Sequence, residues 1–185
     1  MDELLDIVSD EDIVIGQESR SEVHRLGLQH RGVHVFLFTP DGKLLIQKRS
    51  ANRDYPSSWD GSVSEHVKAG ESYLDAALRG MREEMGVEGI EVRPLITFKL
   101  NYGPNDNEIS RLYEGMIDPS RVSFDPLEIE EIDYYSMEKL TDIMASGQEK
   151  LCSWFIEILN WQLGRPTQIS ILKASQTSGS WVAGI

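Results

Sequence analysis

Short apolar runs separated by turn residues fill the first third of the chain. Residues 4–8 and 13–16 flank an acidic turn, and this pattern predicts a β-hairpin. Residues 33–39 form a β-branched and aromatic run that stops at a Pro-Asp-Gly sequence, after which residues 43–48 resume the pattern. Pro, Asp and Gly between two apolar runs are typical of a tight turn, so these segments predict a second hairpin.

The apolar residues take a helical spacing after Ser72. Leu, Ala and Met side chains recur with this period up to Gly86, and Ser72 has an acid three residues later, as in a capping box. Glycine is the residue type that most often ends a helix. Residues 136–146 and 150–163 predict two further helices, and the second carries its large apolar side chains on one face.

Strand patterns occupy the intervals between these helices. Residues 59–63, 90–100, 109–117 and 132–135 are rich in residues that favour strands. The order of strands, helix, strands and helices predicts an α/β fold in which helices pack on a mixed β-sheet.

The length of 185 residues suits one domain with a hydrophobic core. We expect this domain to span residues 1–164, including the N-terminal hairpin, and a C-terminal tail to span residues 165–185. The tail contains no acidic residue and many small polar ones. It is either a loose, flexible extension or an added strand.

The charge balance restricts the partners. The chain has 31 Asp and Glu residues and 18 Lys and Arg residues, a formal net charge of −13. We expect no nucleic-acid and no membrane partner, because such binding needs basic side chains at phosphates. An acidic protein that acts on a phosphorylated small molecule needs divalent cations to bring the two together. Residues 31–53 differ from the rest, with five basic side chains and one acid.

The sequence also indicates a compartment. A single cysteine, Cys152, excludes an intramolecular disulfide framework and fits a reducing environment. Met1 is followed by two acids rather than by a basic segment, so no signal peptide is recognised. The longest apolar runs, residues 33–39 and 154–159, are shorter than a membrane span. We expect a cytoplasmic protein, and the sequence leaves its oligomeric state open.

Two adjacent carboxylates lie near the end of the first long helix. Glu83 and Glu84 share a helix face with residue 80, because residues three and four apart are neighbours. Their carboxylates repel each other unless a cation lies between them, and hard oxygen ligands suit Mg²⁺ or Mn²⁺. The alternative interpretation is a solvated acidic helix end.

Residues 65–87 resemble the Nudix box, which runs Gly-x5-Glu-x7-Arg-Glu-apolar-x-Glu-Glu-x-Gly-apolar. The matching positions are Glu71, Arg79, Met81, Glu83, Glu84, Gly86 and Val87. The resemblance covers roughly residues 3–163 and implies a Nudix-type α/β/α sandwich with a mixed β-sheet. It also implies a hydrolase dependent on Mg²⁺, or on Mn²⁺ as the alternative. Such an enzyme cleaves the diphosphate linkage of a small molecule, typically a nucleoside diphosphate derivative.

The resemblance assigns catalytic roles to the box carboxylates. Glu83 and Glu84 would hold the metal, and one of them, or a glutamate from a late loop, would orient or deprotonate water. Glu131 is the expected late-loop residue, with Glu128 and Glu130 as neighbouring candidates. The alternative for this acidic run is a solvated turn.

The chain departs from the Nudix box at two positions. The first glycine of the box is replaced by Glu65, and the glutamate after Arg79 is replaced by Gly80. In the family this second position usually supplies a metal ligand. The departure predicts weakened metal binding, a substitute ligand from elsewhere, or a catalytically impaired module that binds a nucleotide or a protein.

Other segments resemble type I isopentenyl diphosphate isomerase, an enzyme that itself has the Nudix fold. They include residues 36–44, residues 59–66, the tripeptide at 107–109, and Trp154. This second resemblance makes an isomerase-like enzyme the alternative function.

The isomerase family has a second metal site built from histidines and two glutamates. Here His30, His66 and Glu108 fall on three of its positions, Asp106 replaces the other glutamate, and His24 lies one residue from the remaining histidine. Three or four imidazole and carboxylate groups make a credible metal site. Taken singly, each histidine is more often a structural residue.

Two further matches bear on substrate and reaction. Arg49 and Arg53 fall on positions where the isomerase binds its diphosphate, and Lys48 precedes them. Arginine suits such oxyanions because its planar group donates two hydrogen bonds at once. The alternative interpretation is a solubilising strand edge, where basic residues are common. The catalytic cysteine of the isomerase falls at Ser64, whose hydroxyl is a far weaker acid than a thiol. The hydrolase interpretation is therefore preferred.

Overall fold

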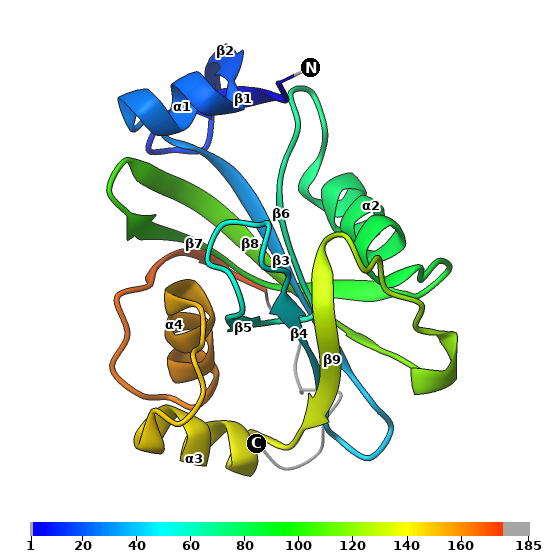
Figure 1. Cartoon of the computed structure of the whole chain (residues 1–185). Coiled ribbons are helices and arrows are strands. Elements are labelled where there is room, and N and C mark those ends of the chain that lie inside the picture. Colours follow the sequence, from blue (N-terminus) through cyan, green and yellow to red (C-terminus); the bar gives the residue numbers. More distant parts are fainter. Residues whose placement is uncertain (1, 176–185) are drawn as a thin grey trace.

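The computed structural model describes residues 2–175, in which a mixed β-sheet lies between helices on both faces (Figure 1). The strands are β1 (Leu4–Val8), β2 (Val14–Ser19), β3 (His30–Phe38), β4 (Leu44–Arg49), β5 (Trp59–Asp60), β6 (Val63–His66), β7 (Val92–Gly103), β8 (Asp106–Met116), β9 (Ile129–Tyr135) and β10 (Ser170–Ala174). The helices are α1 (Arg20–Leu26), α2 (Tyr73–Met85), α3 (Met137–Ser146) and α4 (Ser153–Gln162), with a 3-10 turn at Pro119–Arg121. The predicted α/β/α sandwich is confirmed.

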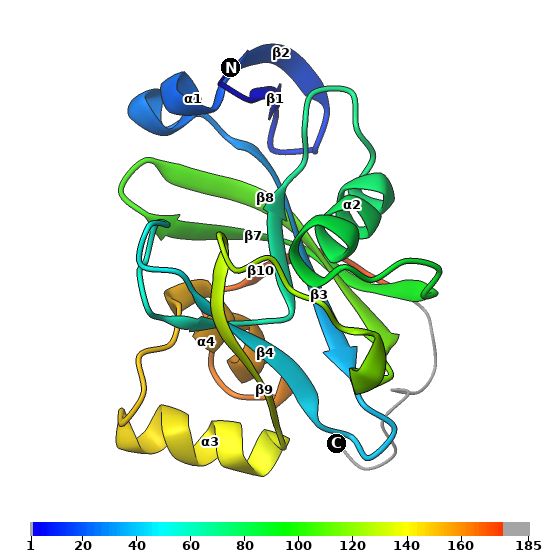
Figure 2. The same cartoon turned by 45° about the vertical axis from the view of Figure 1, so that its right-hand side comes forward.

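Strand β3 is central because it pairs with four other strands. It runs parallel to β8 over its whole length and antiparallel to β6, and it meets β1 and β4 at its two ends. The longest path through the sheet is β10-β7-β8-β3-β1-β2, while β4 continues to β5 and β9. Figure 2 shows β3 crossing the middle of the sheet between α2 and α4.

The sheet separates two hydrophobic cores, and β3 contributes to both. Val33, Val35 and Leu37 pack with α2, whereas Phe36 and Phe38 pack with α3 and α4. Side chains alternate between the two faces of a strand, so a strand covered on both faces is apolar at nearly every position. This explains why every residue from 33 to 38 except His34 is apolar.

Helix α2 begins and ends where its sequence predicts. The hydroxyl of Ser72 accepts a hydrogen bond from the backbone N–H of Asp75 at 3.1 Å. Gly86 ends the helix with a φ of 63°, a left-handed conformation that glycine adopts without strain. The capped helix therefore presents Glu83 and Glu84 in its last turn, as expected.

Helix α1 was not expected from the sequence, and β10 matches one of the two alternatives left open for the tail. Helix α1 is short and shows no repeated apolar spacing that would have predicted it. Val23 is its one buried residue, and packing of the helix against the rest of the protein stabilises it. In the tail, residues 170–174 form β10, which pairs antiparallel with β7 and corresponds to the added strand of the two alternatives. Residues 176–185, the rest of the predicted tail, lie outside the described residues.

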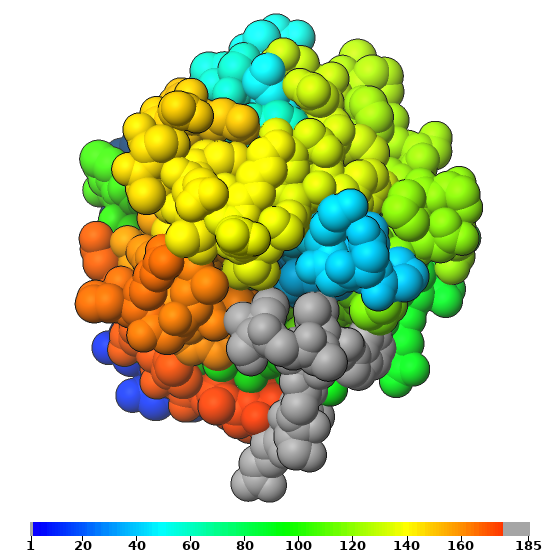
Figure 3. Space-filling view, turned by 90° about the horizontal axis from the view of Figure 1, so that it is seen from below, coloured from blue at the N-terminus to red at the C-terminus, as the bar shows by residue number. Residues whose placement is uncertain are grey.

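Helices α3 and α4 cover one face of the molecule side by side (yellow and orange in Figure 3). Their apolar residues form one core with the aromatic side chains of β3, and Phe155 meets Phe36 edge to face with ring centroids 5.8 Å apart. Within residues 2–175, none of the helices has the length and apolar character needed to cross a membrane.

Cys152 precedes α4 and is 1% exposed. Burial, together with the nearby carboxylate of Asp60, raises the pKa of its thiol. A neutral, inaccessible thiol does not attack disulfide reagents, because the thiolate is the nucleophile. We expect no reaction of the native chain with a thiol reagent such as DTNB at pH 8 and one thiol per chain after denaturation. Rapid labelling of the native chain would contradict this packing.

Candidate functional site

A cleft of about 840 Å³ runs from α1 and the start of β8 to the last turn of α2. Three groups of side chains line it: histidines with two carboxylates, the carboxylates around α2, and arginines on and after β4. The same cleft therefore combines candidate cation ligands with candidate anion ligands.

Strand pairing brings the first group together. His30 begins β3 and lies opposite Glu108 in the parallel β3–β8 pair, while His66 ends β6 opposite Gly32. Asp106 is the first residue of β8. Helix α1 directly precedes β3 and supplies His24. We refer to these five ligand candidates as the histidine centre: His24, His30, His66, Asp106 and Glu108.

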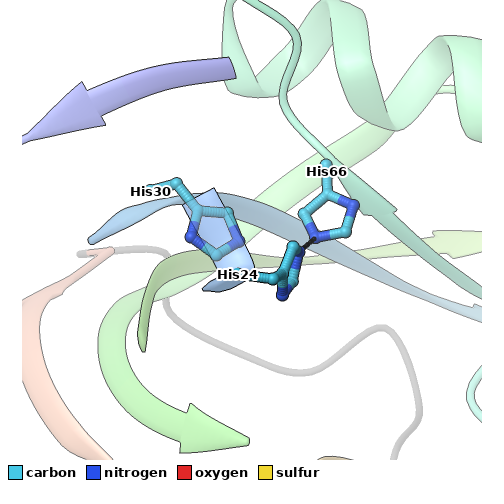
Figure 4. A group of neighbouring side chains, drawn as sticks. All are labelled: His24, His30 and His66. Atoms are coloured by element: carbon cyan, nitrogen blue, oxygen red, sulfur yellow. Dashed lines mark hydrogen bonds between the residues drawn. The ribbon is translucent and has the colours of Figure 1, made fainter. Parts of the chain in front are cut away.

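The candidate ligand atoms of the histidine centre converge. His24 Nε2 lies 3.3 Å from His66 Nε2, and the three imidazole centroids are 5.0 to 5.2 Å apart (Figure 4). Glu108 Oε1 lies 3.6 Å from His30 Nε2 and 3.7 Å from His66 Nε2. Asp106 Oδ1 lies 3.5 Å from His24 Nδ1. Three of these residues, His30, His66 and Glu108, were predicted as ligands.

The histidine centre is short of positive charge. His30 Nδ1 lies 3.0 Å from the carbonyl of Leu28, to which only an N–H can donate, so Nε2 of the neutral ring carries a lone pair. This Nε2 and Asp106 Oδ1 are buried without a hydrogen-bond partner within residues 2–175. A buried lone pair that faces carboxylate oxygens requires a proton or a cation.

The pKa shifts agree with this picture. Burial lowers the pKa of His66 to about 3, and burial together with Glu108 raises the pKa of Asp106 to about 6. Burial opposes ionisation of Glu108, but His30 outweighs it and lowers the pKa of Glu108 to about 2. Burial lowers the pKa of His24 as well, whereas for His30 the Glu108 carboxylate outweighs burial and raises the pKa. Once His30 loses its proton, the imidazole nitrogens and carboxylate oxygens form a donor set that fits a divalent transition metal.

Gly32 makes room for one of these carboxylates. A Cβ at this position would lie 1.8 Å from Glu108 Oε2 and 2.8 Å from Ser110 Oγ. Only glycine therefore allows the Glu108 side chain to occupy its place between β3 and the imidazoles.

A chain of buried hydrogen bonds connects Ser64 with the histidine centre. Ser64 Oγ lies 3.2 Å from His34 Nδ1, and His34 Nε2 lies 2.9 Å from the hydroxyl of Tyr102. Tyr102 contacts Ser110 Oγ at 2.8 Å, and Ser110 donates to Glu108 Oε2 at 2.7 Å. Because the carboxylate only accepts, every hydroxyl in the chain can point toward it, which leaves His34 Nδ1 to accept from Ser64.

The second group lies at the end of α2. Glu84 is 4% exposed, and its Oε2 accepts a hydrogen bond from Gln47 Nε2 at 2.5 Å. Its Oε1 is buried without a hydrogen-bond partner among residues 2–175. Burial, and then the charge of Glu65, raises the pKa of Glu84 well above the usual range. Glu83 is half exposed at the same cleft. A cation beside Glu84 would satisfy the unpaired oxygen.

Arg79 connects the carboxylates of this region. It donates to Glu71 Oε1 at 2.9 Å, to Glu65 Oε2 at 3.1 Å and to Glu83 Oε2 at 3.3 Å. It also donates to the backbone carbonyl of His66 at 2.8 Å. One guanidinium thereby links the end of α2 to β6 and to the histidine centre.

The predicted basic residues separate into two positions. Arg49 and Arg53 line the cleft, where Arg49 lies 3.4 Å from Asp60 Oδ2 and Arg53 lies 2.9 Å from Glu128 Oε1. Lys48 does not line it, because adjacent residues of a strand point to opposite sides.

The predicted late-loop glutamate also requires a correction. Glu131 is exposed, is paired with Lys48 in the β4–β9 register, and does not line the cleft. Glu130 contacts Lys48 at 3.0 Å on the same outer side. Glu128, the third candidate, does line the cleft, because it precedes the first residue of β9 and lies beside Arg53. The strand geometry thus places the earliest acid of this run at the site.

Sequence reasoning did not assign Glu65, His34 or Tyr102 to the site. Glu65 was recognisable as a departure from the Nudix box, but its position beside Arg79 requires the fold. His34 and Tyr102 come from β3 and β7, which both pair with β8, and no spacing in the sequence connects them.

Comparisons with known proteins agree with this architecture. The isopentenyl-diphosphate Delta-isomerase of Serratia proteamaculans is 33% identical over 164 residues, 86% of this chain and 90% of the isomerase. An uncharacterized Nudix hydrolase of Streptomyces coelicolor is 43% identical over 102 residues, 55% of this chain and 56% of the hydrolase. The crystal structure of a Deinococcus radiodurans protein has a TM-score of 0.72 at 28% identity and covers 86% of this chain and 98% of its own. The model of the NUDIX domain family matches residues 28–155, so the chain belongs to that family.

Proposed function

We propose that this chain is a divalent-cation-dependent hydrolase that cleaves the diphosphate linkage of a small molecule such as a nucleoside diphosphate derivative. The observation that carries the proposal is the buried, unpaired Oε1 of Glu84 beside a cleft lined by arginines. An unpaired buried carboxylate oxygen is costly, and the cost is recovered when a cation binds.

Each residue at the end of α2 has a part in this proposal. Glu84 would hold Mg²⁺, and the half-exposed carboxylate of Glu83 would accept a proton from the attacking water. The bound cation would lower the pKa of that water and neutralise charge on the leaving phosphate. Arg79 keeps Glu83 in place through its ion pair.

The arginines on the opposite side of the cleft would bind the diphosphate. Arg49 lies over the Trp154 ring, 5.7 Å from its centroid, and its Nε donates to the backbone carbonyl of Asp54 at 2.7 Å. Arg53 pairs with Glu128 and would exchange that partner for a phosphate oxygen. Arginine favours phosphate because two parallel N–H donors match two oxygens.

A second candidate function is isomerisation of an isoprenoid diphosphate, and the histidine centre favours it. The centre has candidate ligands at positions implied by the isomerase resemblance. A chain of hydrogen bonds also links Ser64 to Glu108, by way of His34, Tyr102 and Ser110. A serine hydroxyl is nevertheless a poor acid toward carbon compared with a thiol, so this function ranks second.

One assay distinguishes the two. The folded chain with Mg²⁺ is incubated with a panel of nucleoside diphosphate derivatives, and released phosphate is measured after phosphatase treatment. A parallel reaction with isopentenyl diphosphate is examined for dimethylallyl diphosphate. We expect cleavage of at least one nucleotide and no isomer. Isomerisation without any cleavage would reverse the order of the two candidates.

A further inference from the structure

The two departures from the Nudix box lie in contact. Gly80 occupies the place of a usual ligand glutamate, and Glu65 occupies the place of a usual glycine. A Cβ at Gly80 would lie 3.0 Å from Glu65 Cγ and 2.5 Å from Val63 Cγ1. The Glu65 side chain therefore fills the space above α2 that a side chain at position 80 would need.

This position places the Glu65 carboxylate near Glu84. Residues 80 and 84 are one helical turn apart on the same face, so a group above Gly80 neighbours the Glu84 side chain. Glu65 and Glu84 both line the cleft. Glu65 Oε2 accepts from Arg79 at 3.1 Å, whereas its Oε1 has no hydrogen bond to any of residues 2–175.

A second observation points to a ligand there. Glu84 is 4% exposed, and its Oε1 has no hydrogen-bond partner among the described residues. Two neighbouring carboxylates, each with one oxygen uncommitted, repel each other when both are ionised. The arrangement therefore requires either a proton on one carboxylate or a cation beside both.

We infer that Glu65 supplies, from β6, the cation-ligand carboxylate that the Nudix box otherwise supplies from α2 at position 80. The two substitutions are then one exchange: the carboxylate has moved from the helix to the facing strand, and the helix residue has lost its side chain to admit it. This inference rests on the proposed function, because it concerns the cation that serves hydrolysis. It makes the box of this chain complete rather than impaired.

Glu71 is a stringent control for Glu65, because it holds Arg79 more extensively. Glu71 accepts two hydrogen bonds from Arg79, at 2.9 and 3.1 Å, whereas Glu65 accepts one at 3.1 Å. The two side chains are similarly protected, 16% exposed for Glu71 and 17% for Glu65. Glu71 does not line the cleft. Neutralising either residue removes an ion pair from Arg79, but of the two only Glu65 lines the cleft together with Glu84.

The test is calorimetric titration of the full-length chain with Mg²⁺ in the absence of substrate. We expect Glu65→Gln to weaken Mg²⁺ binding by about tenfold or more, and Glu71→Gln to leave it within about twofold of wild type. Equal losses of Mg²⁺ affinity in both variants would mean that Glu65 only positions Arg79, and would overturn the inference. Unchanged Mg²⁺ binding in Glu65→Gln would also overturn it. Because no turnover is measured, failure of hydrolysis alone does not affect this result.

Reversing the exchange gives a second test. Gly80→Glu alone would clash with Val63 and Glu65, so the restored arrangement is Val63→Ala/Glu65→Gly/Gly80→Glu, compared with Val63→Ala/Glu65→Gly. We expect the double variant to lose Mg²⁺ affinity and the triple variant to regain it. A folded triple variant with no more affinity than the double would contradict the exchange. If circular dichroism shows the triple variant unfolded, the comparison of Glu65→Gln with Glu71→Gln decides.

Discussion

Replacing Glu84 by Gln is expected to lower Mg²⁺-dependent hydrolysis by about 10³-fold, because a bound cation contributes several kcal/mol of transition-state stabilisation. The substitution preserves the shape of the side chain and an oxygen that can accept from Gln47. It removes the charge that would hold the cation. Initial rates at saturating substrate and Mg²⁺ measure the effect.

The same variant should become more stable without metal. The pKa of Glu84 is raised well above its usual value of 4.5, chiefly by burial, so its ionised form disfavours the folded state. This destabilisation is absent below pH 4.5 and grows as pH rises toward the raised pKa. At pH 7.5 we expect the metal-free melting temperature of Glu84→Gln to exceed that of wild type. Mg²⁺ should raise the melting temperature of wild type only.

Glu88→Gln is a suitable control for Glu84→Gln. Glu88 follows α2, is exposed, and does not line the cleft. Its replacement changes the net charge equally and should leave rate and melting temperature unchanged. Comparable losses in both variants, or a Glu84→Gln enzyme with the wild-type rate, would contradict the role assigned to Glu84.

Replacing His66 by Ala is expected to weaken binding of Mn²⁺ or Zn²⁺ at the histidine centre by at least about 100-fold, since loss of an outer-shell partner alone costs 10- to 100-fold. His66 Nε2 lies 3.3 Å from His24 Nε2 and 3.7 Å from Glu108 Oε1, so a ligand is lost from the middle of the set. Metal content after loading and dialysis, measured by mass spectrometry, shows the result.

Glu84→Gln provides the reciprocal control for His66→Ala. The histidine centre and the end of α2 share no candidate ligand, so Glu84→Gln should keep the transition metal and His66→Ala should keep the Mg²⁺-induced rise in melting temperature. Loss of both properties in either variant would mean that the two sites are one.

The sequence predicted the parts of this molecule that local pattern determines. The hairpin around residue 41, the cap at Ser72 and the end of α2 at Gly86 each follow from the conformational preferences of a few neighbouring residues. The β-branched and aromatic run at residues 33–39 indicated the first strand of that hairpin. The resemblance to known families then implied His30, His66 and Glu108 as a group.

The remaining features depend on contacts between distant segments. Glu65 fits above Gly80 only because β6 crosses α2 at that residue, which no local pattern encodes. Glu128, rather than Glu131, reaches the cleft because the β4–β9 register fixes which acid lies outside the strand pair. In this account, Glu65 on β6 supplies the carboxylate that α2 lacks at position 80.

The most direct test of the central claim is cleavage in ¹⁸O-labelled water, followed by ³¹P NMR. The Mg²⁺-loaded chain is incubated with nucleoside diphosphate derivatives, and isopentenyl diphosphate is included as the competing substrate. We predict a nucleotide product with one ¹⁸O on a single phosphate, formed by wild type and not by Glu84→Gln. Conversion of isopentenyl diphosphate by folded wild-type protein, with no ¹⁸O in any phosphate, would contradict the proposed hydrolase.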